Sequence, residues 1–237
     1  MGGAKRSCSL RTRSRLPRLA DHFEANRLPT YYKRSRFIAM NSLLELQRKW
    51  DRASRWYDLG TAALEALVFS RLRSRLLKSA TGRVLEVAAG SGLNLVHYPR
   101  HLDVTAVDLS PGMLLRARNR GAHKVVVMDA EHLAFKDGSF DTVVSTLGTC
   151  TFLNPVGALR EMRRVCRPGG TVLLLEHGRS NRVALAGWQD HHAHRWAAHL
   201  GCWWNRELLD SLRKAGLQPR AATRECLGMV HVIQAGF

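Results

Sequence analysis

The chain has 237 residues, of which 45% are apolar, and its 37 Lys and Arg residues against 19 Asp and Glu residues give a formal charge of +18. A chain of this length buries about 70% of its unfolded surface and folds without disulfides or metal, which excludes disorder throughout. The longest weakly polar run, residues 59–69, falls far short of the roughly 20 apolar residues that span a bilayer, so we predict no transmembrane segment. The five cysteines are widely spaced without a C-x-x-C pair, which favours a reducing compartment.

The positive charge is concentrated near the N-terminus. Residues 1–55 contain 14 Lys or Arg and 4 Asp or Glu, a net charge of +10. The first 20 residues contain six basic groups and no acid, which is typical both of a mitochondrial or chloroplast transit peptide and of a basic arm. We therefore predict a leader or arm over residues 1–35, and a surface over residues 1–55 for a large assembly, RNA or an anionic membrane.

Two helices are predicted after this arm, forming a helical extension over residues 36–80. Apolar residues recur every three or four positions over residues 36–49 and again over residues 61–78, which is the period of an amphipathic helix. We expect the second helix to bury Leu64, Leu67, Val68, Leu72 and Leu76 and to point Arg71, Arg73 and Arg75 toward solvent.

From residue 81 onward, short apolar segments alternate with segments of helical length. This alternation predicts βαβ units, and hence an α/β fold whose parallel sheet is covered by helices on both faces. Pro168, Gly169 and Gly170 predict a turn before the fifth strand. The expected strands cover residues 83–88, 104–108, 124–128, 142–145 and 171–176, and residues 218–223 and 227–234 are expected to pair as terminal strands.

A small-residue loop follows the first of these strands. Gly90 and Gly92 let a ligand approach the backbone at the start of a helix, although Leu95 stands where the dinucleotide fingerprint needs a third glycine. The next two strands each end in an acid, Asp108 and Asp129. A carboxylate at such a position can accept from ribose hydroxyls or from an adenine amine, which predicts a nucleoside site; the alternative is that both acids cap helices.

The segment from Tyr57 to about Leu217 resembles class I S-adenosylmethionine-dependent methyltransferases of the UbiE type. It is most similar to the branch that contains the animal methyltransferase-like thiol methyltransferases and a yeast mitochondrial methyltransferase-like protein. The resemblance implies a Rossmann-like domain over residues 81–237, with a mostly parallel seven-stranded sheet, the helical extension and a helical cap after strand 5. Family motifs are found at residues 84–92, 108–113, 129–135, 139–141 and 160–170, and branch motifs at residues 147–151, 175–180 and 201–206.

The resemblance also implies S-adenosylmethionine as cofactor and S-adenosylhomocysteine as product. Gly90 and Gly92 would cradle the methionine part of the cofactor, and Glu86 would reach its amine through water. Asp108 would hold the ribose and Asp129 the adenine amine. The family often has glycine at position 88, and we expect the alanine of this chain to need only a negative φ there. The predicted cofactor set is Glu86, Ala88, Gly90, Gly92, Asn94, Asp108, Leu109, Met113, Asp129, Ala130 and Ser145.

Three residues are candidates for a catalytic role on the acceptor side. His177 could act as a general base, because an imidazole titrates near neutral pH, or it could hydrogen-bond a loop. Cys150 is a candidate nucleophile, but direct methyl transfer needs no covalent intermediate, so it fits better as a small packing residue. Tyr57, with Trp56, could form a lid over the cofactor or pack in the core. Residues past strands four and five that could line this side are Ser145, Thr149, Cys150, Asn154 and His177.

The sequence predicts no metal site. His191 and His194 share a helical face, but the next positions on that face are alanines, so His191, His192, His194, His199 and Cys202 do not match a ligand pattern. The tryptophans of the same region indicate instead a helical lid over an apolar acceptor.

These observations predict a methyltransferase acting on a small-molecule or lipid-like acceptor through sulfur, oxygen or nitrogen. Nucleobase amines are disfavoured because residues 145–148 lack the Asn/Asp-Pro-Pro-aromatic clamp. One alternative is a structural or accessory subunit of a large mitochondrial assembly, either a ribonucleoprotein or a membrane complex, and another is an rRNA methyltransferase. The expected location is the mitochondrial matrix or the matrix face of the inner membrane, with the cytoplasm or a plastid as alternatives.

Overall fold

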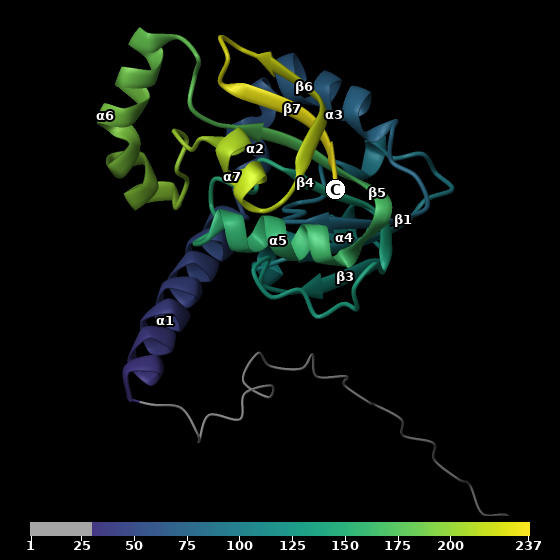
Figure 1. Cartoon of the computed structure of the whole chain (residues 1–237), viewed down its shortest axis with the longest axis horizontal. Helices are drawn as coiled ribbons and strands as arrows, with labels where there is room; N and C mark the ends of the chain where they lie inside the picture. The colour runs from purple at the N-terminus through teal and green to yellow at the C-terminus, as the bar shows by residue number, and fades with distance from the viewer. Residues whose placement is uncertain (1–29) are drawn as a thin grey trace, which may run out of the picture. The chain divides into compact units, whose positions relative to one another are not determined.

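The structure of the chain is a computed structural model that describes residues 30–237, with the side chains of residues 30–41 and 200 excepted (Figure 1). Two compact units divide the chain, residues 1–41 and residues 42–237, and helix α1 (Thr30–Ala53) runs from the first into the second. Most of the predicted leader or arm, residues 1–29, lies outside the described residues. The predicted boundaries at residues 35 and 80 stay predictions. No helix in the described range is long and apolar enough to cross a membrane.

A seven-stranded sheet forms the centre of the second unit. Its strand order is β3-β2-β1-β4-β5-β7-β6, and every pairing is parallel except those of β7, which is antiparallel to β5 and β6. The predicted α/β class and the terminal strand pair are confirmed. The strands are β1 (Arg83–Val87), β2 (Asp103–Asp108), β3 (Lys124–Val127), β4 (Phe140–Thr146), β5 (Cys166–His177), β6 (Gln218–Glu225) and β7 (Val230–Gly236).

The start of β5 differs from the sequence-based expectation. Residues 167–170 were expected to form a turn before the strand, but β5 already pairs with β4 at Cys166 and Phe140. The register then shifts before Thr171 pairs with Thr142, and Gly169 adopts a φ of 76°. The Pro-Gly-Gly segment is therefore an irregularity inside the strand, because glycine permits the chain to bulge without leaving the sheet.

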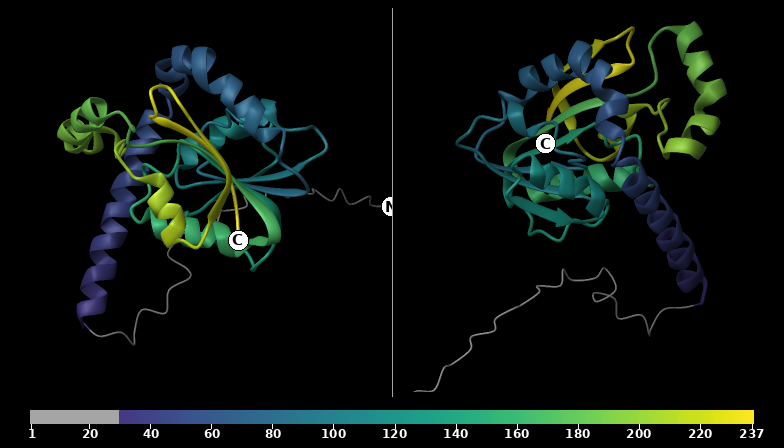
Figure 2. Two further views of the ribbon diagram at one scale, coloured as in Figure 1. Left: turned by 45° about the horizontal axis from the view of Figure 1, so that its top comes forward. Right: turned by 180° about the vertical axis from the view of Figure 1, so that it is seen from behind.

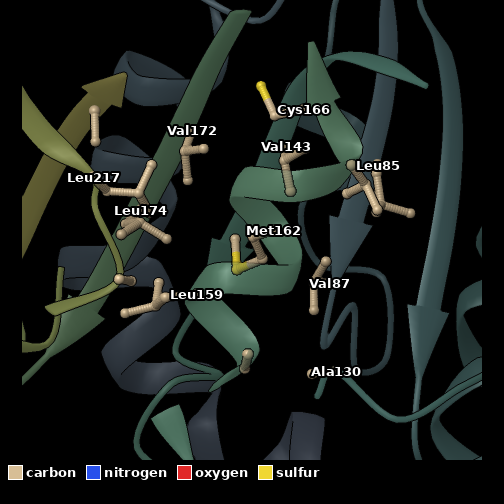
Figure 3. Packing of buried hydrophobic residues seen from close by; sticks show 14 of the residues in the cluster. Leu85, Val87, Ala130, Val143, Leu159, Met162, Cys166, Val172, Leu174 and Leu217 are labelled. Carbon is tan, nitrogen blue, oxygen red and sulfur yellow. The ribbon is translucent and has the colours of Figure 1, made fainter. Parts of the chain in front are cut away.

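Helices cover both faces of the sheet, as predicted (Figure 2). On one face, Leu159 and Met162 of α5 (Pro155–Val165) pack with inward residues of β1, β4 and β5 (Figure 3). Leu212 of α7 (Leu208–Lys214) belongs to the same buried cluster. On the other, Leu72 and Leu76 of α3 (Ser70–Leu77) cover the opposite side of the same strands. Helix α4 (Pro111–Asn119) packs beside β2 and β3.

The helical extension corrects one prediction about side-chain direction. Between α2 (Tyr57–Leu64) and α3 lies a π-helical turn, η2 (Glu65–Phe69), whose wider turn shifts the faces of the helix on either side of it. Leu64 and Leu67, expected inside, are 57% and 82% exposed. Arg73, expected outside, is only 3% exposed. A single 3.6-residue period over residues 61–78 could not reveal this shift.

The segment after β5 contains the expected helical cap. Helix α6 (Val183–Leu200) ends at Gly201, whose φ of 68° is the left-handed conformation that closes many helices. Trp196 stacks on Trp204, at a centroid separation of 4.7 Å, and Trp204 also contacts Trp188. These rings tie the returning chain to α6.

Candidate functional site

A cavity lies where the carboxyl ends of β1, β2, β3 and β4 meet. Parallel strands bring their carboxyl ends to one edge, and there the loops after each strand contribute residues to its wall. Helix α1 adds Leu43, Leu46 and Trp50 from the opposite side. Of the residues predicted from the sequence, eight line this cavity: Tyr57, Ala88, Gly90, Asp108, Leu109, Met113, Asp129 and Ala130.

The loop after β1 has a positive φ at three alternate positions. Ala88, Gly90 and Gly92 all adopt positive φ, of 55°, 56° and 82°. A Cβ at Gly90 would meet nothing within 4 Å, so the loop there leaves open space. A Cβ at Gly92 would lie 2.9 Å from the Cα of Ala117, so this glycine lets the loop pack on α4 and does not line the cavity.

Ala88 corrects the expectation that alanine would sit at negative φ. Its φ of 55° is a conformation that costs an L-residue about 1–2 kcal/mol. We expect Ala88→Gly to raise the free energy of unfolding by about 1 kcal/mol, because glycine adopts this conformation without strain. Ala89→Gly is the matched control: φ at Ala89 is not positive, and glycine should lower stability there. Urea unfolding of both variants measures this, and a destabilised Ala88→Gly would contradict the assignment.

Asp108, at the end of β2, is held in place by backbone groups. Its Oδ2 accepts from the Gly90 N–H and its Oδ1 from the Ser110 N–H, both at 2.8 Å. Burial raises the pKa of this carboxyl to about 6, against the opposing effect of these hydrogen bonds. Asp51 of α1 accepts from Ser110 Oγ and from the Gly112 N–H, so α1 is joined to the first turn of α4 beside Asp108.

The raised pKa of Asp108 predicts how cofactor affinity depends on pH. The ionised carboxylate is the better acceptor for ribose hydroxyls, and it is lost below about pH 6. Affinity for S-adenosylmethionine should therefore fall by up to about tenfold per pH unit from pH 6 toward pH 5. The contribution of this group to stability has the opposite sign, since a raised acid pKa makes the folded state more stable as pH falls from about 6 to about 4.

Calorimetric titrations between pH 5 and pH 7.5 measure this dependence, and Asp108→Asn is the control because an amide does not titrate. A slope that persists in Asp108→Asn would assign the dependence to another group.

A buried polar network lies behind the loop and includes a residue that sequence reasoning missed. Arg73 Nη1 donates to Asn94 Oδ1 at 2.7 Å and to Thr146 Oγ1 at 2.6 Å, and its Nε donates to Glu65 at 2.8 Å. Asn94 Nδ2 in turn donates to Glu86 Oε1 at 2.9 Å. Arg73 and Thr146 line the cavity, whereas Asn94 and Glu86 support it from behind. This places a fixed positive charge at the wall.

Trp50 contributes a buried donor without a partner to the cavity wall. Its indole Nε1 makes no hydrogen bond with the described residues, and Trp50 lines the cavity. Glu86 lies behind the wall, where burial raises the pKa of its carboxyl to about 7, against hydrogen bonds from Asn94 and from the Tyr98 hydroxyl that act to lower it. Buried polar groups without partners are rare in folded proteins, so the Trp50 donor indicates a ligand with an acceptor group.

The start of α2 is joined to the glycine loop. Asp58 accepts from Ser91 Oγ at 2.5 Å and pairs with Arg116 and Arg120 of the α4 region. Tyr57 therefore lies in the cavity wall, in edge contact with Trp50, and burial raises its pKa to about 12, so its hydroxyl stays protonated. Trp56, expected beside it in a lid, is 70% exposed and is not part of the wall.

Asp129 lies at the far end of the cavity, just after β3. Its carboxylate accepts from the Glu131 N–H at 3.0 Å and contacts His132 Nδ1 at 2.8 Å. Ala130 follows it in the wall, and Leu109 and Met113 lie on the side of α4. Asp108 and Asp129 therefore border the same cavity, as the order of the strands predicts.

The predicted acceptor-side residues lie behind the cavity wall. Ser145 Oγ donates to Glu176 at 2.8 Å. Ser145, His177 and Cys150 are not among the residues that line the cavity. His177 Nε2 is instead 3.3 Å from the Sγ of Cys202, and this contact raises the pKa of His177 although burial acts to lower it. Hydrogen bonding to Cys202 and burial raise the pKa of Cys150. The catalytic roles of His177, Cys150 and Tyr57 stay predictions.

Comparison with known proteins identifies the central segment. Residues 85–174 match the family model described as a methyltransferase domain. A phosphatidylethanolamine N-methyltransferase of Cereibacter sphaeroides is 39% identical over 112 residues, which are 44% of this chain and 55% of that protein. A demethylmenaquinone methyltransferase of Renibacterium salmoninarum is 37% identical over 139 residues, 56% and 58% of the two chains. A mitochondrial methyltransferase of Saccharomyces cerevisiae is 28% identical over 204 residues, 76% and 43%.

Solved structures share the fold. A protein of Thermotoga maritima described as a possible histamine N-methyltransferase has a TM-score of 0.66 at 22% identity, covering 80% of this chain and 98% of its own. The geranyl diphosphate C-methyltransferase of Streptomyces coelicolor, solved with S-adenosyl-L-homocysteine, has a TM-score of 0.62 at 14% identity, covering 76% and 84%. The predicted family resemblance, fold class and S-adenosylmethionine cofactor are confirmed. The chain spans about half the length of the curated relatives it matches.

Proposed function

We propose that this chain, which carries a methyltransferase domain over residues 85–174, transfers a methyl group from S-adenosylmethionine to a small, lipid-like acceptor. The observation that carries the proposal is the cavity itself, where the open glycine loop and two strand-end acids, Asp108 and Asp129, border one space. S-adenosylmethionine is a nucleoside with a charged methionine tail. Its nucleoside end needs hydrogen-bond acceptors, and its tail needs space beside the protein backbone.

The cavity fits the parts of this cofactor. Asp108 would accept from the ribose hydroxyls and Asp129 from the adenine amine. Gly90 leaves space for the methionine part, and Glu86, behind the wall, would reach its ammonium group through water. Arg73 is the buried cation of the wall and would face the cofactor carboxylate.

The cofactor supplies an electrophilic methyl group on a sulfonium. The protein's part in such a transfer is to align the acceptor in line with the methyl and to exclude water. Tyr57 and Trp50 close one side of the cavity, and the loop after β4, with Leu147, Phe152 and Leu153, closes another. No described titratable side chain is required as a base if the acceptor arrives with a free lone pair.

An apolar acceptor is supported by the wall and by the relatives. The leucines of α1 and of the loop after β4 give the cavity an apolar part of its wall. Two relatives are named for phosphatidylethanolamine and demethylmenaquinone, both of which are lipids. We infer that the acceptor of this chain also combines a polar nucleophile with an apolar body.

The test is transfer of an isotope-labelled methyl group from S-adenosylmethionine to lipid extracts. The purified full chain is incubated with phosphatidylethanolamine, a demethylated quinone or an alkyl thiol, and the organic phase is analysed by mass spectrometry. Label is expected in one lipid class, and it should be lost in Asp108→Ala. Label in added ribosomal RNA alone would favour the rRNA alternative, and binding of cofactor without any transfer would favour the accessory subunit.

We further infer a mitochondrial location, supported by the name of the yeast relative and by the composition of residues 1–35. N-terminal sequencing of the protein isolated from its native cells tests this. A start well after Met1 is expected for a cleaved leader, whereas an intact Met1 or Gly2 would favour a basic arm and its partners.

A further inference from the structure

Three side chains that do not line the cavity lie close together, those of Cys150, His177 and Cys202. The Sγ atoms of Cys150 and Cys202 and a ring nitrogen of His177 all lie within 4.8 Å of one another. Cys202 Sγ and His177 Nε2 are 3.3 Å apart. The three residues come from the loop after β4, the end of β5 and the turn after α6, so no short sequence pattern could connect them.

The backbone around this cluster is held in place from several directions. The Trp203 N–H donates to the Cys150 carbonyl at 2.9 Å, which ties the turn after α6 directly to the loop after β4. Arg206 donates to the Thr149 and Phe152 carbonyls, both at 2.7 Å. The cluster is therefore prearranged, as a binding site must be if ligand atoms from three segments are to meet.

The ligand types and spacing match a thiophilic metal ion. With Zn–S bonds of about 2.3 Å and Zn–N bonds of about 2.0 Å, tetrahedral ligand atoms lie about 3.5–3.8 Å apart, which is within the 4.8 Å limit of this cluster and slightly more than its Cys202–His177 contact of 3.3 Å. Cys150 and Cys202 are only 2% and 8% exposed, so their sulfur atoms are shielded from solvent. Two thiolates balance the charge of a divalent ion, so the ion can be held inside the protein.

We propose that Cys150, His177 and Cys202 bind one Zn²⁺ ion, with a fourth position left to water. Binding releases two protons to solvent, one from the Cys150 thiol and one that Cys202 and His177 share. The ion would fasten the loop after β4 to the turn after α6, and because Leu147, Gly148 and Thr151 of that loop border the cavity, it would shape the acceptor side. His177 is then a metal ligand and is not free to act as a base.

The test uses the full chain, reduced, stripped with a chelator and titrated with zinc alone by calorimetry. One ion per chain is expected, and Co²⁺ in its place should give thiolate-to-cobalt charge-transfer absorption. Cys202→Ser should weaken zinc binding by about hundredfold or more. Cys166→Ser, at a buried cysteine outside the cluster, and Cys226→Ser, at an exposed one, are the matched controls and should bind as the wild type does.

A second measurement needs no variant. Zinc should protect Cys150 and Cys202, but not Cys226, from alkylation, as read by peptide mass spectrometry. Wild-type protein that binds no stoichiometric zinc, or loses as much affinity in Cys226→Ser as in Cys202→Ser, would overturn the proposal. Cofactor binding by the zinc-free protein is read separately, so failure here leaves the methyltransferase proposal intact.

A different observation concerns the outer face of residues 56–67, within the helical extension. Its large exposed side chains are Trp56, Leu59, Leu64 and Leu67, which are 57–82% exposed, and Gly60, Ala62, Ala63 and Ala66 between them are also exposed. The acids of this segment point elsewhere: Asp58 pairs with Arg116, and Glu65 with Arg73. A contiguous apolar face without exposed acid is uncommon on a soluble surface.

Basic residues flank this apolar face on both sides. Arg52 and Arg55 are exposed before it, and Arg71 and Lys78 after it. An apolar helical face with basic flanks is the pattern of a helix that lies in the interface of an anionic bilayer. We propose that residues 52–78 dock on an anionic lipid surface. This proposal rests on the proposed lipid-like acceptor. Docking would bring the segment that contributes Tyr57 and Arg73 to the cavity wall close to the membrane that holds the acceptor.

Cosedimentation of the full chain with phosphatidylglycerol-containing vesicles tests the docking. Leu59→Gln combined with Leu67→Gln should weaken binding at least about tenfold, because two exposed leucines no longer enter the interface. Val96→Gln combined with Val183→Gln, at sites 77% and 90% exposed, is the control and should bind as wild type.

Unchanged vesicle binding in the leucine variant would overturn the docking and assign any binding to residues outside this face. Self-association of the wild type that the same substitutions abolish, seen by analytical ultracentrifugation, would instead make the face a contact between two copies. Cofactor affinity of the leucine variant, expected to be unchanged, keeps this outcome separate from the methyltransferase proposal.

Discussion

Replacing Asp108 with alanine is expected to weaken S-adenosylmethionine binding by about hundredfold or more. The carboxylate is oriented by the N–H groups of Gly90 and Ser110 and borders the cavity, so its remaining lone pairs would accept from the ribose of the proposed cofactor. Two hydrogen bonds to a charged acceptor contribute about 1.5–3 kcal/mol each, which sets the size of the effect. Calorimetric titration of the folded variant measures it.

The matched control for this prediction lies on the same strand. Asp103 begins β2, is half exposed and pairs with Lys124 on the surface at 2.7 Å. Asp103→Ala removes the same chemical group 5 residues away and should leave cofactor affinity within about twofold of wild type. Equal affinities for Asp103→Ala and Asp108→Ala would mean that the cofactor does not contact the end of β2.

Replacing Arg73 with methionine is expected to lower the free energy of unfolding by about 3–5 kcal/mol, because it leaves a charged partner without its counterion inside the protein. Glu65 would lose its ion pair, and Asn94 and Thr146 would lose their shared donor. Affinity for S-adenosylmethionine should fall as well, because Arg73 is the positive charge of the cavity wall. Urea unfolding and calorimetry measure the two effects.

Arg71→Met is the control for Arg73→Met, two residues away on the same helix. Arg71 is exposed, so its loss should change stability by no more than about 0.5 kcal/mol. Arg73→Lys should fall between the two, since lysine keeps the charge but not the planar fork that reaches Asn94 and Glu65 together. An Arg73→Met variant as stable as Arg71→Met would contradict the buried network.

The sequence predicted the site best where a motif residue directly follows a predicted strand. Strand ends are marked by local changes from apolar runs to Asp108 and Asp129, and parallel pairing then brings both acids to one edge whatever the loops between them do. The position of the glycine loop was predicted for the same reason, because it directly follows the apolar strand β1. Its backbone conformation was not, because a positive φ at Ala88 depends on how the loop packs and not on residue type.

Other features of the site depend on contacts between distant segments, which residue patterns do not predict. Arg73 is buried because η2 shifts the helix faces between α2 and α3, and a π-helical turn has no reliable sequence signature. Cys150, His177 and Cys202 meet only after β4, β5 and the turn beyond α6 are placed side by side. The amphipathic period of α1 was predicted, but not that Trp50 would border the cavity.

Hydrogen–deuterium exchange of the full chain with and without S-adenosylhomocysteine tests the central claim most directly, because it locates a bound cofactor without any substitution. Protection is expected in residues 86–94, 107–113 and 128–131, the three segments that meet at the cavity, and none is expected in β6 and β7. Absence of protection at saturating cofactor, or protection confined to other segments, would contradict the assignment of this cavity as the cofactor site.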